Sequence, residues 1–199
     1  MYGGRDWHYT SRKDSKNITI TMSNFIHFLT FFRLFSGPII FWLVLIAGQY
    51  GLALTLFAIS SLSDYLDGFL ARKYHSETAL GEVLDPIADK ILVLFLIITL
   101  TLFFQSYFIG FVGAIILSRE FWVSALRDMN ARNNKSDATK VTYFAKLKTT
   151  LQFITFGSFF IGIYFNNALI IFISNFLLFS STLIVVHTGI SYTQASFRD

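Results

Sequence analysis

The chain has 199 residues, of which 54% are hydrophobic and 24 are Phe, and its formal net charge at pH 7 is +4. Asp, Glu, Lys and Arg make up only 14% of the residues, against about 25% in a typical soluble protein. This composition excludes intrinsic disorder, which needs low hydrophobicity, and it argues against a soluble domain and against a nucleic-acid-binding protein, since the basic clusters adjoin long apolar runs.

Three long stretches, residues 34–63, 91–118 and 149–197, contain no Asp, Glu, Lys or Arg. A membrane-spanning helix needs about 20 apolar residues, so each stretch best fits two helices joined by a short turn. Turn-forming residues interrupt the stretches at Gly48-Gln-Tyr-Gly51, Gln105-Ser-Tyr and Asn166-Asn167. The sequence predicts an all-α, polytopic membrane protein with six transmembrane helices, near residues 24–47, 50–73, 82–104, 107–129, 145–165 and 168–191.

The six predicted helices form one domain, residues 24–191, between a polar N-terminal segment, 1–23, and a short tail, 192–199. Lys and Arg gather before the first helix and in the second and fourth connections, whereas the three turns contain none. By the positive-inside rule, we expect both termini and both long connections on the cytoplasmic side of the cell membrane. Any chemistry is then expected at the cytoplasmic membrane boundary.

Four Asp residues flank the connection between the second and third predicted helices. Asp64 and Asp67 share one helical face, and Asp85 and Asp89 share another. The two helices are antiparallel neighbours, so these faces can converge. An Asp costs about 2.5–3.5 kcal/mol at the centre of a spanning helix, and hard cations would offset that cost. A set of oxygen ligands without Cys or His suits Mg²⁺ or Mn²⁺, and paired ions of this kind serve phosphoryl chemistry.

Small residues and one Arg are interleaved with these carboxylates. Gly68, Ala71 and Gly81 leave the facing surfaces bare, so that a bulky polar ligand can approach the backbone, and Arg72 can offset phosphate charge. A carboxylate-coupled transporter is the alternative from another class, since paired carboxylates also serve proton coupling. Transporters more often place such groups mid-bilayer in broken helices, whereas these lie beside a loop.

The same residues resemble the signature of the CDP-alcohol phosphatidyltransferase family, D-x-x-D-G-x-x-A-R, eight residues, and then G-x-x-x-D-x-x-x-D. Every fixed position is present at the correct spacing. The first helix, with Thr30, Arg33 and Pro38, is similar to the family's opening pattern N-x-x-T-x-x-R-x-x-x-x-P, and departs from it where His27 replaces the Asn. The family's six-helix membrane fold agrees with the predicted helices, so the resemblance covers residues 24–191.

The resemblance implies an enzyme that transfers the phosphatidyl group of CDP-diacylglycerol to an alcohol and releases CMP. It implies two divalent metal ions, with Asp89 also acting as general base for the acceptor hydroxyl. The metal ligands that it implies are Asp64, Asp67, Asp85 and Asp89. The nucleotide and diphosphate contacts that it implies are Thr30, Asp64, Gly68, Ala71, Arg72 and Gly81.

A basic run in the fourth and fifth predicted helices bears on the acceptor. The run Arg119-Glu120, Leu126-Arg127 and Lys146-Leu-Lys148-Thr149, with Gln152 beyond, resembles the branch of the family that uses glycerol 3-phosphate. The resemblance implies that this acceptor's phosphate is bound by Arg119, Arg127, Lys146 and Lys148. Phosphatidylglycerol or an inositol phosphate is the alternative acceptor, and contact with anionic lipid head groups is the alternative role for the cations. Family members are often homodimers, which makes a homodimer a further expectation.

Overall fold

The computed structural model describes residues 6–74, 79–133 and 143–197 and, within them, the side chains of 25, 27–63, 81, 83–133 and 147–197. In this part of the chain all regular structure is helical, which confirms the predicted all-α fold. The six helices are α1 (Asp6–Leu45), α2 (Tyr50–Tyr74), α3 (Ala79–Phe104), α4 (Tyr107–Arg132), α5 (Tyr143–Tyr164) and α6 (Ala168–Ser196).

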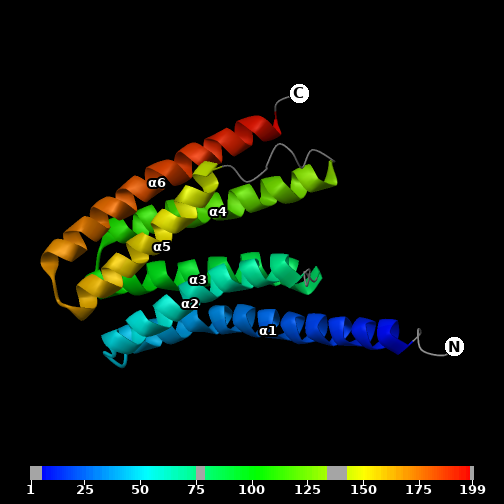
Figure 1. Cartoon of the computed structure of the whole chain (residues 1–199). Coiled ribbons are helices and arrows are strands. Elements are labelled where there is room, and N and C mark those ends of the chain that lie inside the picture. Colours follow the sequence, from blue (N-terminus) through cyan, green and yellow to red (C-terminus); the bar gives the residue numbers. More distant parts are fainter. Residues whose placement is uncertain (1–5, 75–78, 134–142, 198–199) are drawn as a thin grey trace.

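Successive helices run in opposite directions along the bundle, as Figure 1 shows. The turns 46–49, 105–106 and 165–167 lie together at one end, which we call the turn end. The end of α2, the start of α3, the end of α4 and the start of α5 lie at the opposite end, which we call the open end. The helix ends that adjoin the charge-bearing connections are therefore separated from the charge-free turns by the length of the bundle.

The six helices close into a ring. α1 packs on both α2 and α3, α3 packs on α4, α4 on α6, α6 on α5, and α5 on α2. Several of these neighbours, such as α1 and α3 or α4 and α6, are not consecutive along the chain. Each helix contributes a fully or almost fully buried side chain to the shared core, for example Ile40, Phe57, Leu96, Ile116, Phe159 and Val185.

Each of the three turns that the sequence predicts contains one residue in the left-handed conformation. Gly48, Gln105 and Asn166 have φ values of 64°, 49° and 47°, which is the conformation that commonly ends a helix. Ser106 Oγ then accepts a hydrogen bond from the Ile109 amide at 3.3 Å, and so caps α4. Short polar turns of this kind reverse the chain without placing any charge at the turn end.

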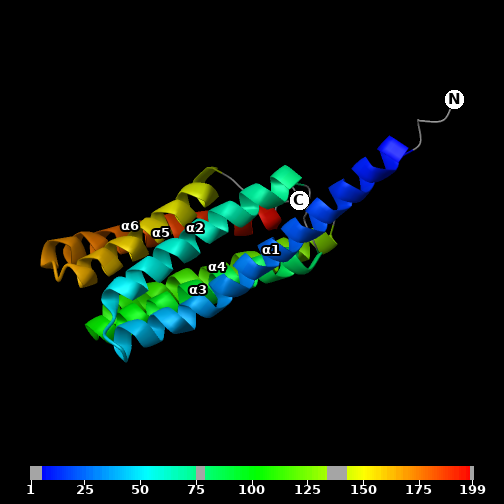
Figure 2. The ribbon, with the colours of Figure 1, turned by 60° about the horizontal axis from the view of Figure 1, so that its bottom comes forward.

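The first helix is longer than the sequence analysis predicts. It begins at Asp6 rather than at residue 24, and its 40 residues correspond to about 60 Å. No Gly or Pro occurs between Gly4 and Gly37, so nothing in that stretch interrupts helix propagation. Figure 2 shows the N-terminal part of α1 projecting beyond the other helices at the open end.

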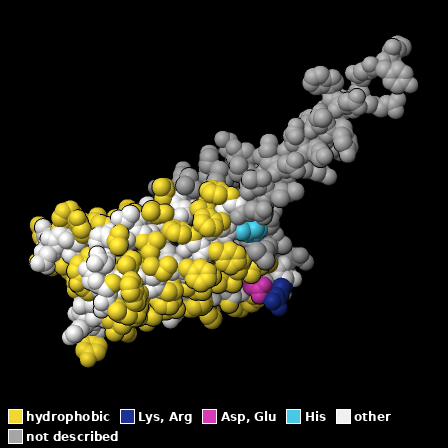
Figure 3. All heavy atoms as spheres, turned by 90° about the horizontal axis from the view of Figure 1, so that it is seen from below, with side chains coloured by type: hydrophobic (Ala, Val, Ile, Leu, Met, Phe, Trp, Pro, Cys, Tyr) yellow, Lys and Arg dark blue, Asp and Glu magenta, His cyan; other side chains and the backbone are white. Residues whose placement is uncertain are grey.

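The outside of the bundle is apolar. Large hydrophobic side chains such as Phe28, Trp42, Phe111, Phe172 and Phe176 are each more than half exposed. Figure 3 shows one such face, on which charged side chains appear at one end only. A helical surface made of exposed large apolar side chains is typical of lipid contact. They indicate a multi-pass membrane protein.

Four described helices are long and apolar enough to cross a bilayer. The spans lie at His27–Leu45 in α1, at Val83–Phe104 in α3, over the whole of α4 and over the whole of α6. The described side chains of α2 provide a shorter apolar stretch, Tyr50–Ser63. The presence of six helices is confirmed, whereas the crossing of the bilayer by all six stays a prediction.

Candidate active site

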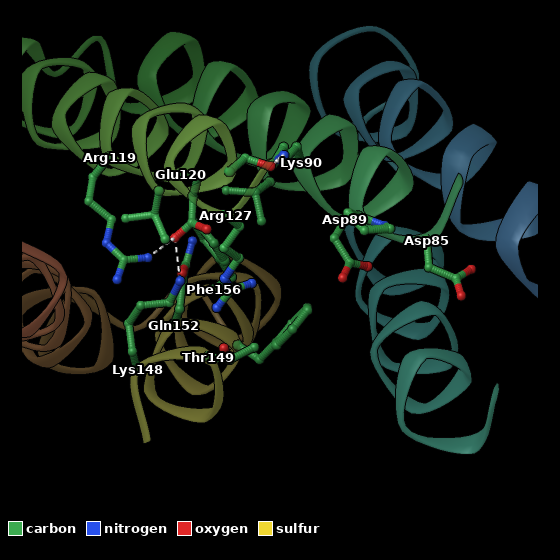
Figure 4. A pocket seen from close by; sticks show the side chains of 15 residues that line it. Asp85, Asp89, Lys90, Arg119, Glu120, Arg127, Lys148, Thr149, Gln152 and Phe156 are labelled. Carbon is green, nitrogen blue, oxygen red and sulfur yellow. Dashed lines mark hydrogen bonds and ion pairs between the residues drawn. The ribbon is translucent and has the colours of Figure 1, made fainter. Parts of the chain in front are cut away.

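A cavity of about 360 Å³ lies between α3, α4 and α5. Its lining comes from the middle of α3, α4 and α5 and from the parts of these helices nearer the open end. Most of its polar lining is charged, and apolar side chains such as Val93 and Phe156 complete it. The polar residues are Asp85, Asp89, Lys90, Arg119, Glu120, Ser124, Arg127, Lys148, Thr149 and Gln152 (Figure 4).

Two carboxylates of α3 form one side of this cavity, and α1 orients both of them. Thr30 Oγ1 donates a hydrogen bond to Asp85 Oδ1 at 2.6 Å, and Arg33 donates from a terminal nitrogen to Asp89 Oδ1, also at 2.6 Å. Thr30 and Arg33 are one turn apart on α1, and the two Asp residues are one turn apart on α3. Side chains from one turn of α1 therefore form hydrogen bonds with side chains from one turn of α3.

Arg33 and Asp89 differ sharply in exposure. The Arg33 side chain is fully buried, whereas the Asp89 side chain is 42% exposed. A buried guanidinium needs a partner for its charge, and Asp89 supplies it while still facing the cavity. The sequence identified Arg33 only as part of the family's opening pattern, and the structure places its guanidinium against Asp89.

Close approach of α1 and α3 makes these contacts possible. A Cβ atom on Gly37 would lie 3.1 Å from Phe95 Cβ and 3.3 Å from Leu92 Cα, so a larger residue there would push the two helices apart. Gly37 follows Arg33 by one turn of α1. Because Gly37 has no side chain, the two helices can approach closely enough for Thr30 and Arg33 to reach the two carboxylates.

The opposite side of the cavity is cationic, and Arg119 is its most constrained member. Arg119 is only 8% exposed. Its Nε donates to the Val185 carbonyl at 3.1 Å and a terminal nitrogen donates to Thr188 Oγ1 at 2.8 Å. A Cβ on Gly189 would lie 2.9 Å from Arg119 Cγ. Val185, Thr188 and Gly189 of α6 therefore restrict both the aliphatic part and the guanidinium group of Arg119.

Glu120 links the cations of two helices. Its Oε1 accepts from Arg119 at 3.4 Å, and the buried Lys148 ammonium on α5 forms an ion pair with the same oxygen. Both interactions are drawn in Figure 4, where Arg119, Glu120 and Lys148 lie together and the two Asp residues lie across the cavity. The guanidinium carbons of Arg119 and Arg127 lie 5.7 and 5.8 Å from the ring centre of Tyr192, within the range of cation–π attraction.

The sequence pattern of the CDP-alcohol phosphatidyltransferase family matches residues 24–187, which is most of the chain. The chain belongs to this family. It is 33% identical over 174 residues to the CDP-diacylglycerol–glycerol-3-phosphate 3-phosphatidyltransferase of Wigglesworthia glossinidia brevipalpis, covering 86% of this chain and 93% of that protein. It is 34% identical over 129 residues to the protein of the same name from Escherichia coli K12, covering 63% of this chain and 70% of that protein.

Enzymes of the CDP-alcohol phosphatidyltransferase family are phosphotransferases of phospholipid biosynthesis that generally use a divalent metal. The structure places half of the carboxylates predicted to bind it, Asp85 and Asp89. Their side chains line one cavity a single turn apart and offer only oxygen ligands, which fits a hard cation. Among the described side chains no group of three potential ligands comes together.

The other predicted residues of the acidic motif and of the basic run lie on helices whose backbone is described. The last three turns of α2 carry Asp64, Asp67, Gly68, Ala71 and Arg72, and the first turn of α5 carries Lys146. Their side chains lie outside the described residues, so their predicted roles stay predictions. Gly81 is buried near the start of α3.

The sequence assigned no specific contact to several residues that line or support the cavity. Glu120 and Gln152 belonged to the motif that suggested the acceptor, but nothing in their spacing assigned them a contact. Lys90 Nζ donates to Ser124 Oγ at 2.7 Å across α3 and α4. Thr188 and Tyr192 lie in a helix without Asp, Glu, Lys or Arg. The sequence of that helix does not distinguish a hydroxyl group that contacts an arginine from its other polar residues.

Proposed function

We propose that this protein transfers the phosphatidyl group of CDP-diacylglycerol to glycerol 3-phosphate, giving phosphatidylglycerophosphate and CMP. The observation that carries the proposal is the cavity that sets two carboxylates of α3 opposite three cations, Arg119, Arg127 and Lys148. The same cavity would then contain both the phosphoryl-transfer centre and the binding site for an anionic acceptor. The names and the extent of the related proteins agree with this reaction.

The carboxylate side would activate the acceptor. Asp89 takes the proton of the acceptor hydroxyl, and the resulting oxygen attacks the phosphorus that bears the diacylglycerol. A new P–O bond forms there as the diphosphate P–O bond breaks, and the electron pair leaves with CMP. Arg33 keeps the Asp89 carboxylate aimed into the cavity throughout.

Metal and nucleotide would be held by the acidic motif. Two Mg²⁺ or Mn²⁺ ions would neutralise the diphosphate and stabilise the departing CMP. Their ligands in this proposal are Asp64, Asp67, Asp85 and Asp89. The nucleotide and diphosphate would contact Thr30, Asp64, Gly68, Ala71, Arg72 and Gly81. The contact between Thr30 and Asp85 adds a second task for Thr30, the orientation of a metal ligand.

The cationic side would bind the phosphate of the acceptor. Arg119, Arg127, Lys148 and, by sequence, Lys146 would surround a dianionic phosphate, for which arginine offers paired donors. A volume of about 360 Å³ is at the small end of the range for ligand pockets, about 300–1,000 Å³. A cavity of this size accommodates a small polar acceptor.

We also propose a cellular location and a membrane orientation for the protein. The six helices would cross the cytoplasmic membrane, with both termini and the active site on the cytoplasmic side, because Lys and Arg gather at the open end. The protein would act on lipid in the bilayer and on a soluble acceptor from the cytoplasm. A homodimer is compatible with this arrangement and remains an expectation.

The reaction can be tested with purified protein in detergent. Radiolabelled glycerol 3-phosphate, CDP-diacylglycerol and Mg²⁺ should give labelled lipid and an equal amount of CMP, a chelator should abolish both, and added Mg²⁺ or Mn²⁺ should restore them. Phosphatidylglycerol and an inositol phosphate serve as competing acceptors. Absence of labelled lipid, or faster CMP release with another acceptor, would contradict the proposed function.

A further inference from the structure

Gln152 is a buried residue of the cavity whose side-chain donor has no acceptor among the described residues. The residue is 5% exposed, and its Nε2 makes no hydrogen bond to any described part of the chain. It lines the same cavity as the cations and the carboxylates. Leaving a donor buried without an acceptor is unfavourable, and such groups in a cavity indicate where a ligand supplies the missing partner.

Glu120 is the second unusual group of this cavity. A carboxylate in an anion-binding enclosure repels phosphate, yet Glu120 lies between Arg119 and Lys148 and is still 20% exposed. Both of these contacts use its Oε1, and the second carboxylate oxygen adds accepting capacity. Lys148 is one turn from Gln152 on α5, so Glu120 and Gln152 flank the same lysine.

A hydroxyl group complements both residues at once, because it accepts one hydrogen bond and donates another. We propose that Gln152 and Glu120 form a subsite for the hydroxyl on the central carbon of the acceptor, with Gln152 Nε2 donating to the hydroxyl oxygen and Glu120 accepting its hydrogen. This inference rests on the proposed function. It makes Gln152 a specificity-determining residue for acceptors that carry a hydroxyl beside the phosphate-bearing carbon.

The position of the subsite agrees with the shape of glycerol 3-phosphate. The reacting hydroxyl lies at one end of that molecule, the phosphate lies at the other, and the second hydroxyl lies between them. The cavity has carboxylates on one side and the cations on the other (Figure 4). Glu120 and Gln152 lie on the cationic side, so an acceptor whose phosphate is bound there places its middle hydroxyl, one carbon from the phosphate-bearing carbon, near them.

The decisive experiment compares two acceptors, glycerol 3-phosphate and 3-hydroxypropyl phosphate, which lacks only the middle hydroxyl. Wild type should prefer glycerol 3-phosphate by about 10- to 100-fold in kcat/KM, the effect of one or two hydrogen bonds in a buried site. Gln152→Met keeps the side-chain length and removes the donor. It should lower kcat/KM for glycerol 3-phosphate, leave the value for the analogue unchanged and so reduce the preference.

Thermal unfolding supplies a readout that does not depend on turnover. Removal of a donor that has no partner should leave the Tm of Gln152→Met equal to or above that of wild type without acceptor. Added glycerol 3-phosphate should raise the Tm of wild type more than that of the variant. Gln194→Met, on the exposed part of α6, is the matched control and should behave as wild type in both experiments.

The outcomes separate this inference from the function on which it rests. If wild type makes no lipid from glycerol 3-phosphate, the proposed function fails. If wild type makes the lipid but Gln152→Met loses activity equally with both acceptors, or keeps the full preference, the hydroxyl subsite is overturned and the function stands. Gln152→Leu repeats the test if the Met variant is not stable.

Discussion

The two sides of the cavity are built in different ways. The carboxylates of α3 each receive one bond from the neighbouring helix α1, and at least Asp89 remains well exposed to the cavity. On the cationic side, Arg119 and Lys148 are almost fully buried, and they are held by α6 and by Glu120. The carboxylate side therefore exposes its side chains to the cavity, whereas the cationic side buries its charged groups and holds them with hydrogen bonds and an ion pair.

This difference suggests a division of work. The carboxylate side would carry the chemical step, so changes there should act mainly on kcat. The cationic side would bind the acceptor in one orientation, so changes there should act mainly on the KM for glycerol 3-phosphate. The following variants test that division, beginning with the largest expected effect.

Asp89→Asn removes the proposed general base and one metal ligand while keeping the shape of the side chain. We expect kcat to fall by about 10³-fold, within the range for loss of general base catalysis, when CMP release is measured. Asp128→Asn is the matched control, because Asp128 is an exposed residue of α4 that pairs only with Arg132 among described residues. Full activity of the Asp89→Asn variant would contradict the assignment of the carboxylate side.

Arg33→Met removes the buried guanidinium and leaves Asp89 without its partner from α1. A hydrogen bond between charged groups contributes about 1.5–3 kcal/mol, so kcat should fall by about 10- to 100-fold with little change in the KM for the acceptor. Arg33→Lys keeps the charge and should recover part of the loss. A rise in KM with unchanged kcat would show that Arg33 serves acceptor binding instead.

Arg119→Lys tests the other side. Lysine keeps the charge but cannot reproduce both the bond to Val185 and the bond to Thr188, because its single ammonium lacks the planar fork of arginine. The KM for glycerol 3-phosphate should rise by about tenfold, and kcat should stay within about twofold. Arg132→Lys, at an exposed position of the same helix, should change neither constant.

Gly189→Ala should have the smallest effect of the series. The added Cβ would lie 2.9 Å from Arg119 Cγ, so the arginine stem has to shift, at a cost of about 1–3 kcal/mol in stability. We expect a lower Tm and a severalfold higher KM for glycerol 3-phosphate. Gly157→Ala is the control, since its Cβ would meet Phe57 at an ordinary contact distance of 3.4 Å. Equal effects of the two substitutions would mean that helix packing alone, and not Arg119, explains the result.

Local patterns in the sequence were sufficient to predict the helices and the turns. Charge-free stretches and turn residues depend only on neighbours along the chain, so they predicted six helices and three turns correctly. The predicted start of the first helix, near residue 24, was wrong, because α1 continues through the polar residues 6–23 and begins at Asp6. Polarity governs which environment a helix occupies, whereas the absence of Gly and Pro allowed it to continue.

The amino-acid sequence by itself determined the fold class, the family resemblance and the residues that bear charge at the open end. Only the tertiary structure decided which of those charges meet. Arg33 reaches Asp89 across 56 positions of sequence, and Arg119 reaches Thr188 across 69. Such contacts depend on the ring order of the helices, in which α3 adjoins α1 and α4 adjoins α6. Helical spacing gives each helix its faces, but the choice of facing partner comes from packing all six helices together.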